Sequence, residues 1–184
     1  MVIISPMYKS LYTLAVMELC RRYCVPIAGV ILRKLDFARF QQEFRRDGMR
    51  LPKKVWRKLV LRADENKEVS SVSLKTVFNR LDCGFSDVRA FARHLAVPVF
   101  GVSTLAEPPR GLLQAAGRMA LFTGGGLVRK PLLEHFSDGI LNVHLGTLPQ
   151  YKGMDVVQAP ILEGCFNTVG MSAHLMAPGL DEGP

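Results

Sequence analysis

The stretch MVIISPMYKSLYTLAVMELCRRYCVPIAGVIL, residues 1–32, decides the fold. Its first five residues form an apolar run typical of a buried strand, and the β-branched run 27–32 predicts a second strand. Between them, the segment 5–10 breaks the first strand, and apolar residues from Leu11 to Tyr23 recur at helical spacing. Strand, helix and strand in this order predict a βαβ unit with two parallel strands.

The rest of the chain continues the alternation of helices and strands. Helices are predicted at 86–95, 111–117, 131–136 and 156–163, and strands at 97–102, 119–123, 140–145 and 169–176. This order predicts an α/β fold, a Rossmann-like open and mostly parallel sheet with helices on both faces. Such sheets bind ligands at the carboxyl ends of their strands, where we expect residues 123–126, 144–146 and 177–181.

A strongly basic segment stands out in an otherwise balanced chain. The 184 residues carry a net charge of +8, and the segment 33–62 alone holds eleven Lys or Arg against three acidic residues. We interpret residues 1–184 as one domain with a basic helical insertion at about 35–63. The insertion is either a solvated helical face or a contact for an anionic partner.

Composition argues against several classes of protein. No stretch approaches the roughly 18 to 20 apolar residues of a membrane helix, and the N-terminal apolar run is too short for a secretory signal. We therefore expect a cytoplasmic protein without membrane contact. The four cysteines show no zinc-like spacing, so we expect no metal site. Cys20 and Cys24, four apart on the predicted helix, are either buried small hydrophobes or half of a metal site.

Three polar residues near the end of the chain predict an active site. Asn142 and His144 are two apart on a predicted strand, so their side chains share one face. Asp181 follows after a gap long enough for a loop, a helix and a returning strand to bring its carboxylate beside the imidazole. An amide, an imidazole and a carboxylate can polarise a carbonyl and move a proton. His174, on the predicted strand before Asp181, either lines this site or serves packing.

The sequence around these residues resembles the folate-dependent formyltransferases. That family carries Asn-x-His, then a Leu-Pro-x-(Tyr/Phe)-(Arg/Lys)-Gly loop, then Asp-x-Gly. The matching residues here are Asn142, His144, Leu148, Pro149, Tyr151, Lys152, Gly153, Asp181 and Gly183. The resemblance is strongest from Gly124 to Pro184. It implies formyl transfer from 10-formyltetrahydrofolate to an amine acceptor, with Asn142, His144 and Asp181 as the catalytic residues and no metal.

The resemblance also assigns binding loops. It implies that two loops hold the folate, formed by Gly126, Leu127 and Val128, and by Ala177, Pro178, Gly179 and Leu180. The loop from Leu148 to Gly153 would shape the acceptor side, with a cis bond before Pro149. In this light the basic insertion would contact an anionic acceptor, such as tRNA or a nucleotide-linked sugar, or the polyglutamate tail of folate.

The chain departs from the family pattern in two places. Leu145-Gly146 stands where relatives carry Pro-Ser, which leaves the acceptor-side contacts undetermined. The first strand also leads into Ser5–Ser10 rather than into a glycine-rich phosphate loop, which argues against glycinamide ribonucleotide as the acceptor. Family domains generally continue beyond the aspartate, so the sequence is either a fragment or a short natural form.

Two other functions stay open at this point. Relatives with the same three residues hydrolyse 10-formyltetrahydrofolate with water as the acceptor. A catalytically silent module that docks an anionic polymer through the basic insertion is the third interpretation. The sequence makes no prediction of oligomeric state.

Overall fold

The structure is a computed structural model that describes residues 1–34, 74–112, 117–124, 126–153, 156–179 and 181–183. The predicted basic insertion at 35–63 and the predicted folate contact Leu180 lie outside the described residues. So does most of the predicted helix 111–117.

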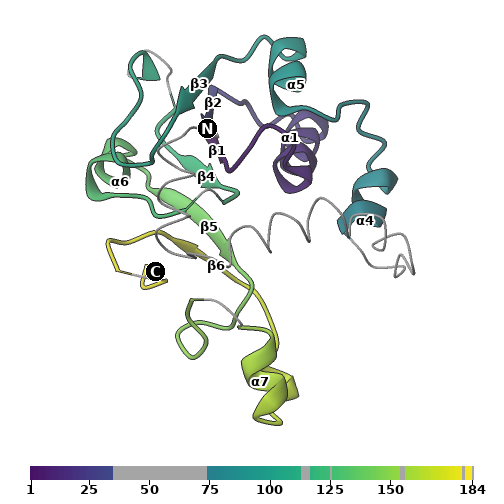
Figure 1. The fold of residues 1–184 in the computed structure, drawn as a ribbon, viewed down its shortest axis with the longest axis vertical. Coiled ribbons are helices and arrows are strands. Elements are labelled where there is room, and N and C mark those ends of the chain that lie inside the picture. Colours follow the sequence, from purple (N-terminus) through teal and green to yellow (C-terminus); the bar gives the residue numbers. More distant parts are fainter. Residues whose placement is uncertain (35–73, 113–116, 125, 154–155, 180, 184) are drawn as a thin grey trace, which may run out of the picture.

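The described residues form one open sheet with helices around it (Figure 1). The strands are β1 (Val2–Ser5), β2 (Gly29–Arg33), β3 (Val99–Val102), β4 (Ala120–Phe122), β5 (Ile140–His144) and β6 (Ser172–Leu175). The helices are α1 (Leu11–Arg22), α4 (Leu74–Arg80), α5 (Val88–His94), α6 (Lys130–His135), α7 (Gln158–Leu162) and the 3-10 turn η3 (Phe166–Thr168). No helix in this part of the chain is long and apolar enough to cross a membrane.

The sheet order is β3-β2-β1-β4-β5-β6. All neighbouring strands are parallel except β5 and β6, which are antiparallel. The predicted Rossmann-like, mostly parallel α/β fold is therefore confirmed. Two apolar clusters cover the two faces of the sheet, one involving α6 and the other involving α1 and α5 (Figure 1).

The first βαβ unit is built as the sequence predicts. All four residues of β1 are buried, as are the first four of β2. The Ser10 hydroxyl accepts a hydrogen bond from the Thr13 amide at 3.2 Å and so caps the N-terminus of α1. A chain of buried hydroxyls then ties α1 to the carboxyl ends of β1 and β4. It runs from Ser5 to Thr13 (3.0 Å) and on to Thr123 (2.8 Å).

A buried carboxylate holds the last turns of α1. Glu18 is 3% exposed, and its oxygens accept hydrogen bonds from Arg21 and Arg22 at 2.7 to 2.9 Å. The Arg21 hydrogen bond is the main cause that lowers the pKa of Glu18 from 4.5 to about 2, against the opposing effect of burial.

The structure corrects several sequence-based expectations. The predicted strand 169–176 is shortened to β6 because Phe166–Thr168 form a 3-10 turn and β6 pairs only at Ser172–Leu175. Helix α4 was not predicted. Cys24 is exposed and does not share the buried face of Cys20, because α1 ends at Arg22, shortly before Pro26 disfavours further helix.

Candidate active site

The antiparallel pairing of β5 and β6 assembles the candidate site. Its register sets Asn142 opposite His174, and His144 opposite Ser172. Asn142 and His144 alternate with Val143, so their side chains leave the same face of β5. Both histidines are buried, with exposed fractions of 7% for His144 and 5% for His174.

The structure brings His144 and Asp181 together, as the spacing predicted. His144 Nδ1 lies 3.6 Å from Asp181 Oδ2, and the Asp181 side chain is only 11% exposed. The other ring nitrogen, Nε2, lies 2.9 Å from the Tyr151 carbonyl oxygen. Because a carbonyl only accepts, Nε2 carries a proton and donates it. Nδ1 is therefore the nitrogen that faces the carboxylate.

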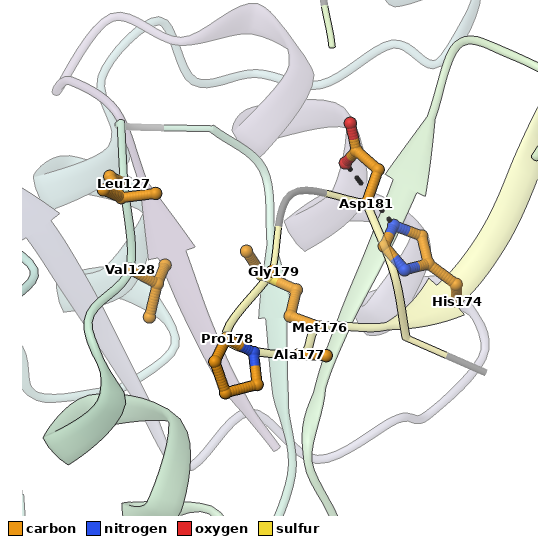
Figure 2. A pocket seen from close by; sticks show the side chains of 8 residues that line it. All are labelled: Leu127, Val128, His174, Met176, Ala177, Pro178, Gly179 and Asp181. Atoms are coloured by element: carbon orange, nitrogen blue, oxygen red, sulfur yellow. Dashed lines mark ion pairs between the residues drawn. The ribbon is translucent and has the colours of Figure 1, made fainter. Parts of the chain in front are cut away.

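His174 joins these residues as a fourth polar side chain. Its Nε2 lies 3.2 Å from Asn142 Nδ2. The same nitrogen lies 3.9 Å from Asp181 Oδ1 (Figure 2). The Asn142 amide nitrogen only donates, so His174 Nε2 accepts. The proton of the neutral ring is then on Nδ1, which lies 3.2 Å from the Leu175 carbonyl. The strand register was the missing signal, since it alone shows that His174 stands opposite Asn142.

The loop from Leu148 to Gly153 closes over the pair of His144 and Asp181. The peptide bond before Pro149 is cis, as the resemblance implied. Besides the Tyr151 carbonyl on His144, the Gly153 amide donates to Asp181 Oδ2 at 2.9 Å. A Cβ on Gly146 would lie 2.8 Å from the Tyr151 carbonyl and 2.9 Å from His144 Nε2, so the glycine at this departure from the family pattern lets the loop pack tightly against the imidazole.

Side-chain contacts anchor the same loop at its two ends. The Leu148 amide donates to Ser172 Oγ on β6 at 3.0 Å. The Tyr151 hydroxyl donates to Glu163, next to α7, at 2.8 Å. Lys152 lies 3.4 Å from Glu182, beside the aspartate.

A tight turn places the carboxylate. Asp181 has a φ of +51°, in the left-handed region that asparagine and aspartate tolerate better than most residues. A Cβ on Gly183 would overlap the Leu175 carbonyl, so only glycine lets the chain pass this close to the end of β6. The lack of room for a Cβ therefore explains why the Asp-x-Gly motif has a glycine at this position.

Most of the predicted folate-loop residues meet at one pocket (Figure 2). Leu127, Val128, Ala177, Pro178 and Gly179 line it, together with Met176, His174 and Asp181. The cavity volume is about 40 Å³, well below the roughly 300 to 1,000 Å³ of small-molecule sites. Gly126, Asn142 and His144 do not line it. The side chain of Arg33 instead lies against Gly126, close to where a Cβ would be.

The site is chemically suited to acyl transfer. It offers amide and imidazole donors, a buried carboxylate and an adjoining pocket with mostly apolar walls. Among the residues that the structure describes, no group of three or more His, Cys, Asp or Glu is arranged to hold a metal ion.

Comparison with known proteins supports this assignment by sequence. Residues 115–184 match the family model described as formyl transferase. The methionyl-tRNA formyltransferase of Clavibacter sepedonicus is 34% identical over 101 residues, 54% of this chain and 33% of that protein. That of Myxococcus xanthus is 36% identical over 100 residues, 53% of this chain and 32% of that protein. The matched part thus spans about a third of the length of these curated relatives.

Comparison of structures extends over the whole chain. The phosphoribosylglycinamide formyltransferase of Bacillus halodurans superposes with a TM-score of 0.56 at 16% identity, covering 100% of this chain and 75% of that one. The glycinamide ribonucleotide transformylase 1 of Symbiobacterium toebii gives 0.53 at 19% identity, covering 100% and 68%. At these identities the likeness shows the fold. The sequence match over residues 115–184 and the shared fold support a formyltransferase-family domain in this chain.

Proposed function

We propose that this protein transfers a formyl group from 10-formyltetrahydrofolate to an amine. The observation that carries the proposal is the cluster of buried His144 with partly buried Asn142 and Asp181 beside a pocket. Its distances of 3.6 Å between His144 and Asp181 and 3.2 Å between Asn142 and His174 hold the three groups at one end of the sheet.

Each side chain has a role in the proposed reaction. The amine attacks the formyl carbon, a C–N bond forms, and the carbonyl oxygen becomes an oxyanion. Asn142 Nδ2 and a protonated His144 donate hydrogen bonds to that oxyanion. Asp181 accepts the proton shed by the amine, directly or through water. The bond from the formyl carbon to the folate nitrogen then breaks, and the departing nitrogen takes a proton.

The hydrogen bonds of the site bear on how the oxyanion is held. His144 Nδ1 faces Asp181, so Nε2 is the nitrogen left to serve the oxyanion. That nitrogen now donates to the Tyr151 carbonyl. In the proposal, the loop carrying Tyr151 shifts when substrates bind, and the oxyanion takes the place of the carbonyl.

The proposal places the two substrates on either side of the carboxylate. Leu127, Val128 and the 177–179 turn offer apolar walls and backbone groups for the pteridine of the folate. The amine enters under the loop from Leu148 to Gly153. We propose an amine on an anionic carrier, such as tRNA or a nucleotide-linked sugar. The curated relatives above are named methionyl-tRNA formyltransferases. The segment after β1 is not a glycine-rich phosphate loop, and its Ser10 caps the N-terminus of α1, which argues against glycinamide ribonucleotide as the acceptor.

The test is to incubate the protein with 10-formyltetrahydrofolate, with and without methionyl-tRNA, and to measure formate and formylated product. Donor loss that depends on the acceptor supports the proposal. Formate release without an acceptor indicates a hydrolase, and no turnover with any amine indicates a binding module.

A matched pair of variants assigns the chemistry. Asp181→Asn should lower turnover by about 10² or more while the protein stays folded. Asp138→Asn is the control, because that carboxylate is 40% exposed and pairs with Arg118. Asp138 lies just before β5, at the opposite end of that strand from His144. Near-normal turnover in Asp181→Asn removes this carboxylate from the mechanism.

A further inference from the structure

A second hollow lies on the opposite face of the sheet from the proposed catalytic residues. Strand residues line it, among them Leu32, Val99 and Gly101. The three cations Lys34, Arg89 and Arg93 line it as well. On β2, Leu32 shares its face with Val30, two residues before it, and Val30 belongs to the cluster that involves α1 and α5. We call this hollow the basic groove.

The proposed catalytic residues lie on the other face. Asn142 and His144 share their face of β5 with Ile140, and Ile140 belongs to the cluster that involves α6. The basic groove and the candidate active site are therefore on different faces of the sheet.

The cations of the basic groove have no acidic partners within the described part of the chain. Lys34, Arg89 and Arg93 form no ion pair there, whereas Arg21 and Arg22 on α1 both pair with Glu18. The acidic residue closest to the two arginines in sequence, Asp87, is engaged in capping α5. It accepts hydrogen bonds from the Arg89 and Ala90 amides at 2.7 and 3.2 Å.

The arrangement of these charges favours an anionic ligand with repeated charges. Arg89 and Arg93 are one turn apart on α5, so their like charges repel each other on the same helix face. Lys34 approaches from the end of β2, against Gly101. The basic groove has a volume of about 700 Å³, within the range of roughly 300 to 1,000 Å³ typical of small-molecule sites.

An aromatic side chain extends the same surface. Tyr8 is 37% exposed, and its ring centroid lies 5.6 Å from the Arg89 guanidinium and 5.7 Å from the Lys9 amine. Cations interleaved with an exposed aromatic ring are typical of surfaces that hold the backbone and stack the bases of single-stranded nucleic acid.

We propose that the basic groove, continued by Tyr8 and Lys9, binds single-stranded RNA through its phosphates. Arginine suits this ligand because its planar guanidinium matches phosphate in a bidentate way. The basic groove is separate from the folate pocket, since β1 and β4 lie between β2 and β5. Binding is therefore measurable without donor or turnover, and it stands or falls independently of formyl transfer.

The test is fluorescence anisotropy of a labelled oligouridine with the full chain, over a range of salt concentrations. Arg89→Gln/Arg93→Gln should weaken binding about fifteenfold at 0.15 M salt, because each lost phosphate contact on a single strand removes about 0.7 from the slope of log K against log salt. The slope should fall by about 1.4 for the two contacts. Arg80→Gln/Arg110→Gln is the control, because it removes two exposed cations that do not line the basic groove. Both double variants leave the basic insertion at 35–63 unchanged.

Two single variants keep the proposal testable if the double variant unfolds. Lys34→Gln, on a different element, should lower the slope by about 0.7. Tyr8→Leu should weaken binding about fivefold or more at an unchanged slope, because stacking carries no counterion release. Equal losses in the groove and control pairs, an unchanged slope in Arg89→Gln/Arg93→Gln, or equally strong competition by polyglutamate would overturn the proposal.

Discussion

The two ends of the sheet differ in the polarity and burial of their side chains. Toward one end, β1 and β2 are apolar and buried along almost their whole length, while the edge strand β3 beyond them is partly exposed. At the other end, three of the five residues of β5 are only partly buried, and β5 and β6 carry Asn142, His144 and His174. The first region supplies apolar burial, and the second supplies polar groups in fixed positions.

This difference teaches that stability and chemistry are separated along the sheet. Apolar burial is the dominant favourable term in folding, and it is concentrated in strands that carry none of the proposed catalytic residues. The polar end is held mainly by hydrogen bonds, such as the Gly153 amide on Asp181 at 2.9 Å. Substitutions at the two ends should therefore affect different measurements.

The largest expected effect is on stability, from Leu14→Ala. Leu14 is fully buried in the cluster that packs α1 and α5 on the sheet. Losing its side chain should lower the free energy of unfolding by about 3 to 5 kcal/mol. Denaturant titration measures this, with Tyr23→Ala, at a position 76% exposed, as the control. A similar loss in both variants would contradict the comparison.

At the polar end, Asn142→Ala should affect turnover instead. Removal of an oxyanion donor costs about 10² to 10³ in kcat. The free energy of unfolding should change far less than in Leu14→Ala, because Asn142 is only partly buried. Steady-state kinetics with 10-formyltetrahydrofolate measure the effect. Asn167→Ala, an exposed amide in η3, is the control, and equal turnover in the two variants would end the assignment of Asn142.

Sequence reasoning was most successful where local pattern dominates. The βαβ unit at the start follows from residues close together in the chain. The meeting of His144 with Asp181 followed from spacing and resemblance.

Features that depend on long-range pairing were beyond the sequence. The opposition of Asn142 and His174 depends on the register of an antiparallel strand pair. The end of α1 before Cys24 left that cysteine exposed although helical spacing predicted a shared face. Helix α4 packs against α1, and this packing had no local signal that we recognised.

A pH titration tests how much the buried carboxylate of Glu18, on α1, contributes to stability at the apolar end of the sheet. The pKa of Glu18 is lowered to about 2, so its carboxylate stabilises the fold above about pH 4.5, and this contribution is lost as the pH falls toward 2. Glu18→Gln should remove about 1 to 2 kcal/mol at pH 7, because the half-exposed arginines are partly screened by water. Thermal melting from pH 7 to pH 3 measures it. A wild-type advantage that persists undiminished at pH 3 would contradict this cause.

The smallest expected effect is that of Tyr151→Phe. The substitution removes the hydroxyl that donates to Glu163 at 2.8 Å, but keeps the carbonyl that holds His144. KM for the acceptor should rise about two- to fivefold with kcat nearly unchanged. Initial rates over a range of acceptor concentrations measure the split, with Tyr23→Phe as the control. A large loss of kcat would show that the hydroxyl itself takes part in the chemistry.

The antiparallel strand β6 has a consequence for how this domain tolerates insertions and deletions. Side chains alternate along a strand, so one residue added between Ser172 and Leu175 would turn His174 to the opposite face and set a neighbour against Asn142. The same insertion would lengthen the path to Asp181. Natural length variation should therefore fall in the connection around α7, and the nine-residue step from Ser172 to Asp181 should be kept.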